Sequence, residues 1–535
     1  MLPISRVSKA LLAAAALALC ARGWAQTASG KEASPASLAA RIRGVTERPD
    51  FRHSHFGIEF LSLDDGSVVF EQNSGKLFVP GSTTKLLTEG TTLALLGADY
   101  RFHTRVYRTG RLGRNETLEG DLILVASGDP NLSNRIQPDG TLAFENHDHS
   151  YGGSPDTRAV PGDPLAVLRE IAGQVARQGI RRIKGRVVVD ASLYPEGNRE
   201  GGTGVVISPI MVNDNVIDIT VEPGRAEGAP AVLRASPSSA YASFASQIQT
   251  GSPSSKLEMD IAGDVTNPDG SHTVTVTGSV PLGSPAILFA YPVPEPRRFA
   301  EVALRECLWD AGVKLEPRAA AAPPEFKSLA ASYTEGNLVA EHVSPPLSEE
   351  IKVTLKVSQN LHASSMPYLW AALLAHKADP GAGFDLEHNF LAGAGLDLSG
   401  AAQSDGAGAD AFYTPDFMVH YLAFLARQKY FQVFYKALPI LGRDGTLWNI
   451  QPEAPAAGQV HAKTGTYVVE NALNKDLMLT GKGLAGYLTT VDGRHLAFAL
   501  YVNLVPLSRD DPDAGTKVAG QALGEIAAAA YDSPR

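Results

Sequence analysis

The sequence predicts an α+β fold in which an antiparallel sheet, flanked by helices, is interrupted by inserted β-rich domains. Three observations support this prediction. Strand–turn–strand patterns occur near both ends of the chain, helical patterns accompany both, and the middle of the chain, roughly residues 98–330, has short strands among Gly, Pro and Ser. With 535 residues, of which 44% are apolar and 19% charged, the chain is long enough for two to four domains.

The first 25 residues have the pattern of a secretory signal peptide. Arg6 and Lys9 precede a short apolar run, and small residues at positions 23 and 25 favour cleavage after Ala25. No later stretch approaches ~18 uninterrupted apolar residues, so we expect an exported, periplasmic protein without a transmembrane anchor. Cys20 is a poor lipidation site, because the residue before it is a large leucine.

The charge and the cysteine content narrow the class of protein further. Cleavage after Ala25 removes three basic residues and no acidic one, which changes the formal net charge from −10 to −13. This acidic balance argues against nucleic acid and against anionic lipid as the main partner. Cys307 is then the remaining cysteine, so we expect no internal disulfide.

The N-terminal end predicts a hairpin followed by a helix. Residues 56–63 and 67–72 alternate apolar and polar side chains around an Asp-Asp-Gly turn at 64–66. A Pro-Gly pair then breaks the chain at 80–81. Leucines recur at helical spacing after this break, until Gly97 ends the pattern.

The C-terminal end is similar in kind. Residues 484–490 and 495–503 flank a turn at 491–494 and predict a second hairpin, and a final helix is expected over 516–530. We expect the two ends to share one sheet. Residues 474–482 are interpreted as an extra loop before this last hairpin.

The middle of the chain predicts short strands, one amphipathic helix at 164–179, and loops at 131–163 and 317–325. The strands lie in the stretches "GDLILVASGDP", "IKGRVVVD", "VIDITVEP" and "HTVTVTGSV". This texture favours an inserted, β-rich region.

Ser82 and Lys85 form the first candidate catalytic pair. Three residues apart at a helix start, they point the same way, so the amine can reach the hydroxyl. A lysine buried against apolar side chains has a lowered pKa and can serve as the base that a serine nucleophile needs. The helix N-terminus adds N–H groups where an oxyanion would form. The alternative is a capping serine followed by a lysine that extends to solvent.

Two later motifs favour the catalytic interpretation. The chain contains Ser358-Gln359-Asn360 and, further on, Lys463-Thr464-Gly465-Thr466. Ser-x-x-Lys, Ser-Asp-Asn and Lys-Thr-Gly, in this order, are typical of active-site-serine penicillin-binding proteins and class A β-lactamases. Each motif alone is weak, but the three in order are specific.

Longer stretches carry a closer resemblance: "LFVPGSTTKLLTEGTTLALLGADYRFHTRVY", "LVASGDPNLS", "IKGRVVVDAS", "SPPLSEEIKVTLKVSQNLHA", "LPILGRDGTL" and "LAGYLTTVDGRHLAFALYVN". The chain resembles the D-alanyl-D-alanine carboxypeptidase/endopeptidase family of low-molecular-mass class C penicillin-binding proteins (peptidase family S13) over nearly its whole mature length. This implies a penicillin-binding/β-lactamase-like catalytic domain with two domains inserted between the first two motifs. The expected division is a signal peptide at 1–25, the catalytic domain at 26–97 and 331–535, inserted domain II at 98–222 and 285–330, and nested domain III at 223–284.

The resemblance also implies roles for individual residues in catalysis. Ser82 would be the acyl-accepting nucleophile and Lys85 its base. Ser358 would pass a proton to the leaving amine, with Lys356 nearby in a Lys-x-Ser-x-Asn pattern. Neither a metal nor a cofactor is implied.

Other residues, Lys356 among them, would bind the substrate. Asn360 would bind the acyl-side amide, and Lys463, Thr464 and Thr466 would hold the terminal carboxylate. Backbone N–H groups of Ser82 and Thr466 would form the oxyanion hole. Along a strand, Lys463 should face away from the two threonines and act from behind them.

The implied function is an exported serine DD-peptidase that hydrolyses peptidoglycan stem peptides and is inhibited covalently by β-lactams. A catalytically impaired peptidoglycan-binding homologue is the alternative, followed by a β-lactamase or a serine esterase. Departures from the family pattern keep this alternative open: Ala407, Ala409 and Asp410 in a usually serine-containing loop, the segment 474–482, and a long 131–163.

Several other polar residues have spacings or positions that could indicate a site. The pairs His53/His55 and His147/His149 have metal-like spacing but lie in polar segments, and we interpret them as solvated. His461 is expected to be a packing neighbour of the third motif. Asp129, which precedes a proline, is expected to stabilise a turn.

Overall fold

The computed structural model describes residues 37–316, 325–511 and 513–533. The predicted signal peptide and nearly all of the predicted loop at 317–325 lie outside these residues. Among the helices that are described, none combines the length and the apolar character that crossing a membrane requires.

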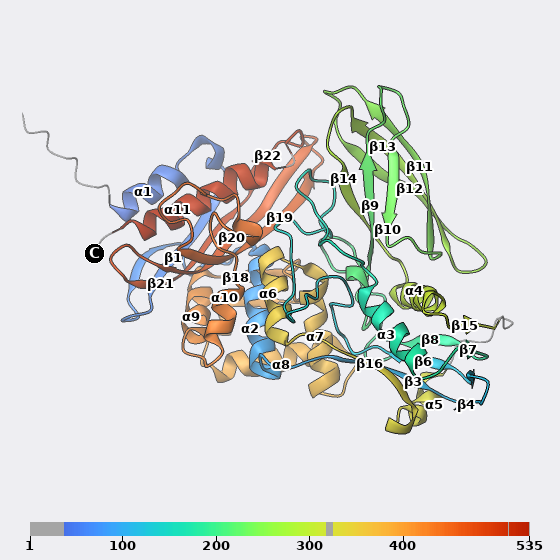
Figure 1. The fold of residues 1–535 in the computed structure, drawn as a ribbon. Coiled ribbons are helices and arrows are strands. Elements are labelled where there is room, and N and C mark those ends of the chain that lie inside the picture. The colour runs from blue at the N-terminus through green and yellow to red at the C-terminus, as the bar shows by residue number, and fades with distance from the viewer. Residues whose placement is uncertain (1–36, 317–324, 512, 534–535) are drawn as a thin grey trace, which may run out of the picture. The chain divides into compact units, whose positions relative to one another are not determined.

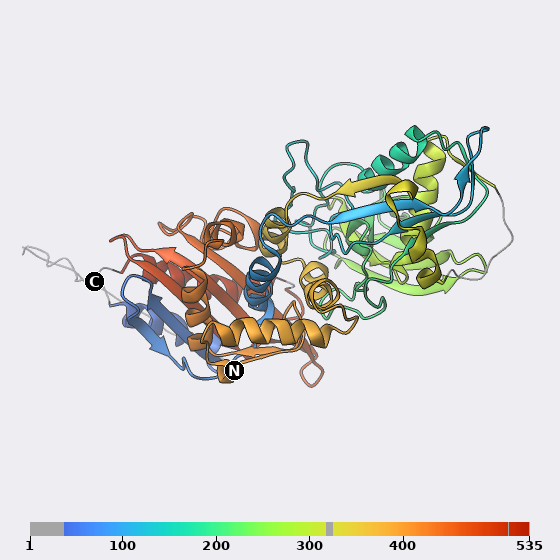
Figure 2. The same ribbon diagram turned by 90° about the horizontal axis from the view of Figure 1, so that it is seen from below.

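One large antiparallel sheet joins the two ends of the chain, as predicted (Figure 1, Figure 2). Its strands follow the order β19-β20-β21-β1-β2, and β22 pairs with β20. Strand β1 runs antiparallel to β21, with Phe56 opposite Val502 and Ser62 opposite Leu496. The bounds are β1 His55–Ser62, β2 Val68–Gln72, β19 Val460–Asn471, β20 Asp476–Thr489, β21 His495–Asn503 and β22 Val505–Leu507.

Helices cover both faces of this sheet because β21 is apolar on both sides. Phe498 and Leu500 alternate with Ala499 and Tyr501, and the two sets belong to different hydrophobic cores. The core that contains Phe498 includes α1 Leu38–Thr46 and α11 Gln521–Tyr531. The core that contains Tyr501 includes α2 Lys85–Leu96, α6 Leu347–Val357, α7 Asn360–Leu374, α8 Pro380–Gly393, α9 Pro415–Leu425 and α10 Phe431–Ala437.

The middle of the chain is β-rich, as predicted, and forms four small sheets. Their orders are β16-β3-β6-β8, β15-β7-β5-β4, β10-β9-β14 and β11-β13-β12. Strand β16, which follows residue 330, pairs with β3, so this sheet takes strands from both sides of the expected domain boundary. The bounds are β3 His103–Arg108, β4 Arg111–Leu112, β5 Thr117–Glu119, β6 Leu122–Val125, β7 Arg182–Ile183, β8 Val187–Asp190, β9 Val216–Glu222, β10 Val232–Ser236, β11 Ala242–Gly251, β12 Glu258–Thr266, β13 His272–Pro281, β14 Ile287–Pro292, β15 Lys314–Leu315 and β16 Leu338–Val343.

Helices and loops complete this region. The predicted helix is α3 Ala166–Arg177, and residues 131–163 contain no helix or strand, also as predicted. Helix α4 Pro296–Asp310 was not predicted. The remaining short elements are α5 Phe326–Leu329, β17 Ala401–Gln403 and β18 Ala411–Tyr413.

The prediction of an extra loop at 474–482 is wrong. Most of it belongs to β20, which extends the β19–β20 hairpin as far as Asp476. Leu477 and Met478 pair with β19 on one side and with β22 on the other. A strand with a neighbour on each side satisfies its backbone groups, and β22 supplies the second neighbour from about 30 residues further along the chain.

Candidate active site

Lys85 is buried at the start of α2, directly after a 3-10 turn that contains Ser82 (Gly81–Thr84). Its Nζ lies 2.8 Å from Ser82 Oγ and 2.6 Å from Asn360 Oδ1. Because its side chain is fully buried, the alternative of a lysine extending to solvent is excluded. Burial removes the hydration of the ammonium and lowers the pKa of Lys85 to about 8, although nearby carboxylates oppose this.

The second motif brings Ser358 beside this pair. Ser358 ends α6 in the left-handed conformation, with φ 65°, and its carbonyl accepts a hydrogen bond from Tyr151 Oη. Its Oγ lies 3.4 Å from Lys85 Nζ and 2.8 Å from Lys463 Nζ. A continuous chain of polar groups therefore runs from Ser82 through Lys85 and Ser358 to Lys463.

Lys356 does not join this cluster. Its ammonium forms an ion pair with Asp444, at 2.7 Å, which leaves it directed at the segment before Thr446 rather than at Ser82. This ion pair gives no support to the expectation that Lys356 binds substrate.

The third motif lies on β19, which is at one end of the sheet order. Lys463 is fully buried and donates to Ser358 Oγ and to Thr464 O, each at 2.8 Å. Thr464 and Thr466 line the cleft instead, as the strand alternation predicts. Burial, together with the ammonium groups of Lys85 and Lys482, holds the pKa of Lys463 well below its usual value.

Two glycines bring the backbones of the first and third motifs together. A Cβ at Gly465 would lie 1.9 Å from Pro80 O and 3.1 Å from Ser82 N, so no other residue fits there. Gly81 has φ 52°, and its Cβ would lie 2.6 Å from Thr466 N. This close approach places the N–H groups of Ser82 and Thr466 near each other, as an oxyanion hole requires.

A cleft of about 420 Å³ connects these groups, with lining from both ends of the chain and from the inserted region. Most of its lining residues were not predicted from the sequence, and two of these are notable. Tyr151 comes from the long 131–163 segment, and Lys482 lies opposite Thr466 in the β19–β20 ladder. The register of β19 against β20 brings Lys482 to this cleft, and a register cannot be predicted from a local sequence pattern.

The unusual loop at 404–410 closes the back of the site through backbone contacts. The Asp405 carboxylate accepts hydrogen bonds from the N–H groups of Ala407, Gly408, Ala409 and Asp410. The Gly406 carbonyl accepts from Thr88, and the Ala407 carbonyl accepts from Lys85 Nζ at 3.4 Å. These hydrogen bonds use main-chain atoms at 406–410, so they do not depend on the side chains of Ala407 and Ala409.

One histidine prediction is wrong. His53 and His55 are exposed, but His149 is buried, with its ring nitrogens 2.7 Å from Asp214 and 2.8 Å from Asp218. Arg135 pairs with Asp214 in the same cluster. The acidic partners come from around β9, more than 60 residues away, so the polar sequence around His149 gave no sign of its burial.

The smaller predictions are confirmed. His461 packs against Tyr435, with ring centroids 4.1 Å apart. The Asp129 carboxylate accepts from Asn131 N, as in a turn. Within the described part of the chain, Cys307 is a buried, free cysteine.

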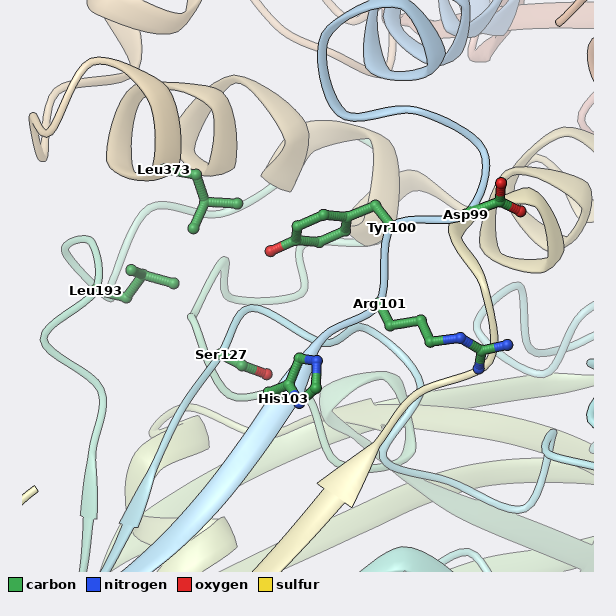
Figure 3. Close-up of a pocket in the computed structure, with 7 residues that line it drawn as sticks. All are labelled: Asp99, Tyr100, Arg101, His103, Ser127, Leu193 and Leu373. Carbon is green, nitrogen blue, oxygen red and sulfur yellow. The ribbon is translucent and has the colours of Figure 1, made fainter. Parts of the chain in front are cut away.

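A second pocket, of about 540 Å³, contains none of the motif residues (Figure 3). It is lined by Asp99, Tyr100, Arg101, His103, Ser127, Leu193 and Leu373. Arg101 donates to Ser344 O and His103 contacts Glu341, so both of these side chains already have partners. The smaller cleft is lined by Ser82, the predicted nucleophile, and Lys85, its predicted base, lies 2.8 Å from that hydroxyl, so this cleft is the candidate active site.

The fold and the cleft define a class of protein. A serine next to a buried lysine, a second serine and a Lys-Thr-Gly strand are the arrangement of active-site-serine penicillin-binding proteins and class A β-lactamases. The chain belongs to the D-Ala-D-Ala carboxypeptidase 3 (S13) family, whose sequence profile matches residues 38–523. This membership confirms the family and the enzyme class predicted from the sequence, a serine-type D-Ala-D-Ala carboxypeptidase.

Individual relatives agree with this membership. The chain is 26% identical over 489 residues to a D-alanyl-D-alanine carboxypeptidase from Actinomadura sp. (strain R39), covering 87% of this chain and 81% of that protein. It is 21% identical to the D-alanyl-D-alanine carboxypeptidase DacB of Haemophilus influenzae, covering 84% and 85%. The crystal structure of penicillin binding protein 4 from H. influenzae superposes with a TM-score of 0.68 at 19% identity, covering 92% of this chain and 99% of that one, which confirms the fold class.

Proposed function

We propose that this chain is an exported DD-peptidase that hydrolyses peptidoglycan stem peptides through an acyl-enzyme on Ser82. The observation that carries the proposal is the position of Lys85 Nζ, buried within hydrogen-bond distance of both Ser82 and Asn360. The chemistry of the site supports two half-reactions, with the proton moving along the polar chain described above.

In acylation, Ser82 Oγ bonds to the carbonyl carbon before the terminal D-Ala while its proton passes to Lys85. The N–H groups of Ser82 and Thr466 stabilise the oxyanion. The peptide C–N bond then breaks, and the leaving amine takes a proton through Ser358. In deacylation, water attacks the ester, and its proton follows the same route in reverse to restore the Ser82 hydroxyl.

Covalent inhibition by β-lactams and the division into domains belong to the same proposal. The H. influenzae relative has been solved in complex with a β-lactam, and a β-lactam presents a carbonyl and a carboxylate as the peptide does. The expected division into one catalytic domain and two inserted domains also remains a proposal. The backbone framework at 404–410 favours an active enzyme over a homologue that only binds peptidoglycan.

The direct experiment is to incubate the purified protein with a diacylated tripeptide ending in D-Ala-D-Ala and to quantify released D-Ala. Cross-linked wall fragments, analysed by mass, report endopeptidase activity in parallel. Covalent labelling without release of D-Ala from either substrate would support the peptidoglycan-binding alternative.

Acylation should depend on pH through Lys85. Only the neutral amine accepts the Ser82 proton, and its pKa is lowered to about 8. We therefore expect the second-order rate constant for labelling by a fluorescent penicillin to rise about tenfold per pH unit from pH 6 until about pH 8. A profile that is flat between pH 6 and pH 8 would contradict the role of Lys85 as base.

Thr466→Val should impair substrates with a free C-terminus selectively. The hydroxyl lost is one that can donate to a carboxylate, and a charge-assisted hydrogen bond contributes roughly 1.5–3 kcal/mol. We expect kcat/KM for the free-acid peptide to fall about ten- to a hundredfold, with a much smaller loss for the C-terminal amide. Thr480→Val, on β20 and hydrogen-bonded to Tyr467 O, is the matched control. Equal losses on both peptides would place carboxylate recognition elsewhere.

A further inference from the structure

Lys482 is a buried cation in the cleft that the peptidase chemistry described above does not use. It lies on β20 directly opposite Thr466 on β19, and its Nζ is 2.7 Å from Thr466 Oγ1. Only 6% of the residue is exposed, yet it lines the same cleft as Ser82 and Thr464. Its ammonium therefore lies on the side of the cleft where the third motif is expected to hold the substrate's carboxylate.

The three buried lysines of the site differ in what they already contact. Lys85 is engaged with Ser82 and Asn360, and Lys463 with Ser358 Oγ and the carbonyl of Thr464. Among the described residues, Lys482 takes part in no ion pair, and its hydrogen-bond partner is a neutral hydroxyl. Of these three lysines, Lys482 is the one that hydrogen-bonds to neither Ser82 nor Ser358, the two serines of the proton pathway.

A buried ammonium without an anion is costly, because burial removes hydration that nothing replaces. Burial accordingly lowers the pKa of Lys482 to about 8. An anion bound in the cleft would replace the missing hydration and stabilise the charged form. The arrangement is that of a binding site whose counter-ion arrives with the ligand.

The hydrogen bond to Thr466 adds direction to this charge. A hydroxyl has one proton and two acceptor lone pairs. Since Lys482 donates to Thr466 Oγ1, the hydroxyl proton of Thr466 remains free to be donated into the cleft. A carboxylate placed there would accept from Thr466 and lie close to the ammonium of Lys482.

We propose that Lys482 supplies the positive charge that recognises the C-terminal carboxylate of the substrate, whereas Lys463 serves Ser358 and the proton pathway. This inference rests on the proposed function and deepens it, since it makes Lys482 the residue that determines preference for free carboxyl ends. The assignment of Lys463 to the carboxylate, implied by the family resemblance, is replaced.

The test compares Lys482→Met with the wild-type protein on two peptides that differ only at the C-terminus, a free acid and an amide. We expect kcat/KM for the free acid to fall about ten- to a hundredfold in the variant, while the value for the amide changes less than about threefold. Lys482→Arg should retain most of the preference, because the guanidinium is still charged. Lys475→Met removes an exposed lysine from the turn of the same hairpin and is the matched control.

Equal losses on both peptides in Lys482→Met would overturn the inference and leave the peptidase function standing. Wild-type protein that neither releases D-Ala nor reacts with penicillin would instead refute the proposed function. In that case, calorimetric binding of the same two peptides to Ser82→Ala still decides the inference. A preference for the acid that Lys482→Met removes supports it, and no preference overturns it.

A pH series covers the case in which Lys482→Met does not fold. The charged and titratable groups around this cleft come from four parts of the chain: Lys463 on β19, Lys85 on α2, His147 and Asp156 in the 131–163 segment, and Asp513 and Lys517 near the C-terminal helix. In the wild-type protein the ratio of kcat/KM for acid over amide should fall as the pH rises past about 8, whereas in Lys482→Arg it should persist. The same decline in Lys482→Arg would overturn the assignment.

Discussion

Ser82→Ala should abolish covalent labelling by a fluorescent penicillin while the protein stays folded. The variant loses one hydroxyl, whose hydrogen-bond partner is Lys85, and the surrounding helices keep their packing. Without the oxygen that forms the ester no acyl-enzyme can exist, and peptide hydrolysis should fall by about 10⁴-fold or more. Gel fluorescence after incubation, together with the thermal unfolding midpoint, measures both outcomes.

Variants of the base provide the control for this result. Lys85→Arg keeps the positive charge, but a guanidinium does not give up its proton at accessible pH, so it cannot act as the base. We expect Lys85→Arg and Lys85→Ala to be similarly defective in labelling. Wild-type stoichiometry of labelling in Ser82→Ala would show that the nucleophile is a different residue.

Arg135→Met should destabilise the protein more than any surface change. Arg135 is 2% exposed and lies between the carboxylates of Asp148 and Asp214, whose pKa values it helps to hold below the usual range. Removing it leaves two buried carboxylates short of a cation, which costs about 3–5 kcal/mol in such networks. The urea midpoint, followed by intrinsic fluorescence, measures the loss.

The pH dependence of this loss follows from the sign of the pKa change. Without Arg135, the folded-state pKa of the carboxylates rises above the unfolded value, so the folded variant binds protons that the unfolded chain releases. Its stability then falls as the pH rises, and the difference from wild type should be larger at pH 8 than at pH 5. Arg158→Met, an exposed arginine in the same segment that bonds only carbonyls, should cost less than about 0.5 kcal/mol. A loss of similar size in both variants would contradict the special role of the cluster.

The buried cluster also links the inserted region to the second motif. Gln359, between Ser358 and Asn360, donates to Asp148 Oδ1, and His362 on α7 contacts Asp214. The left-handed turn at Ser358 is therefore flanked by contacts to the 131–163 segment and to Asp214, just before β9. His149 contacts the same Asp214, so the prediction that it is solvated missed its place in this cluster.

Much of the fold and the core of the site follow from local patterns in the sequence. A spacing of three residues at the start of a helix places Lys85 within hydrogen-bond distance of Ser82. Alternation of apolar and polar residues around Asp-Gly turns defines both terminal hairpins. These relations extend over one turn of helix or one hairpin, so spacing and residue type are sufficient to predict them. The order of the three motifs then indicated an active-site-serine enzyme, and the longer stretches carried the resemblance to the family.

Other features depend on contacts between segments far apart in the chain. Strand register places Lys482 opposite Thr466, 16 residues earlier in the chain. Pairing with β22 makes most of the expected loop at 474–482 a strand. His149 is buried in contact with Asp214, which is 65 residues away in the chain. Asp444 likewise takes Lys356 out of the cleft. Burial and pairing of this kind depend on which segments pack together, and no local spacing carries that information. The sequence by itself therefore determined the pairing of Ser82 with Lys85 and the sheet that joins the two ends, whereas the tertiary structure decided which lysine in the cleft has no anionic partner among the described residues.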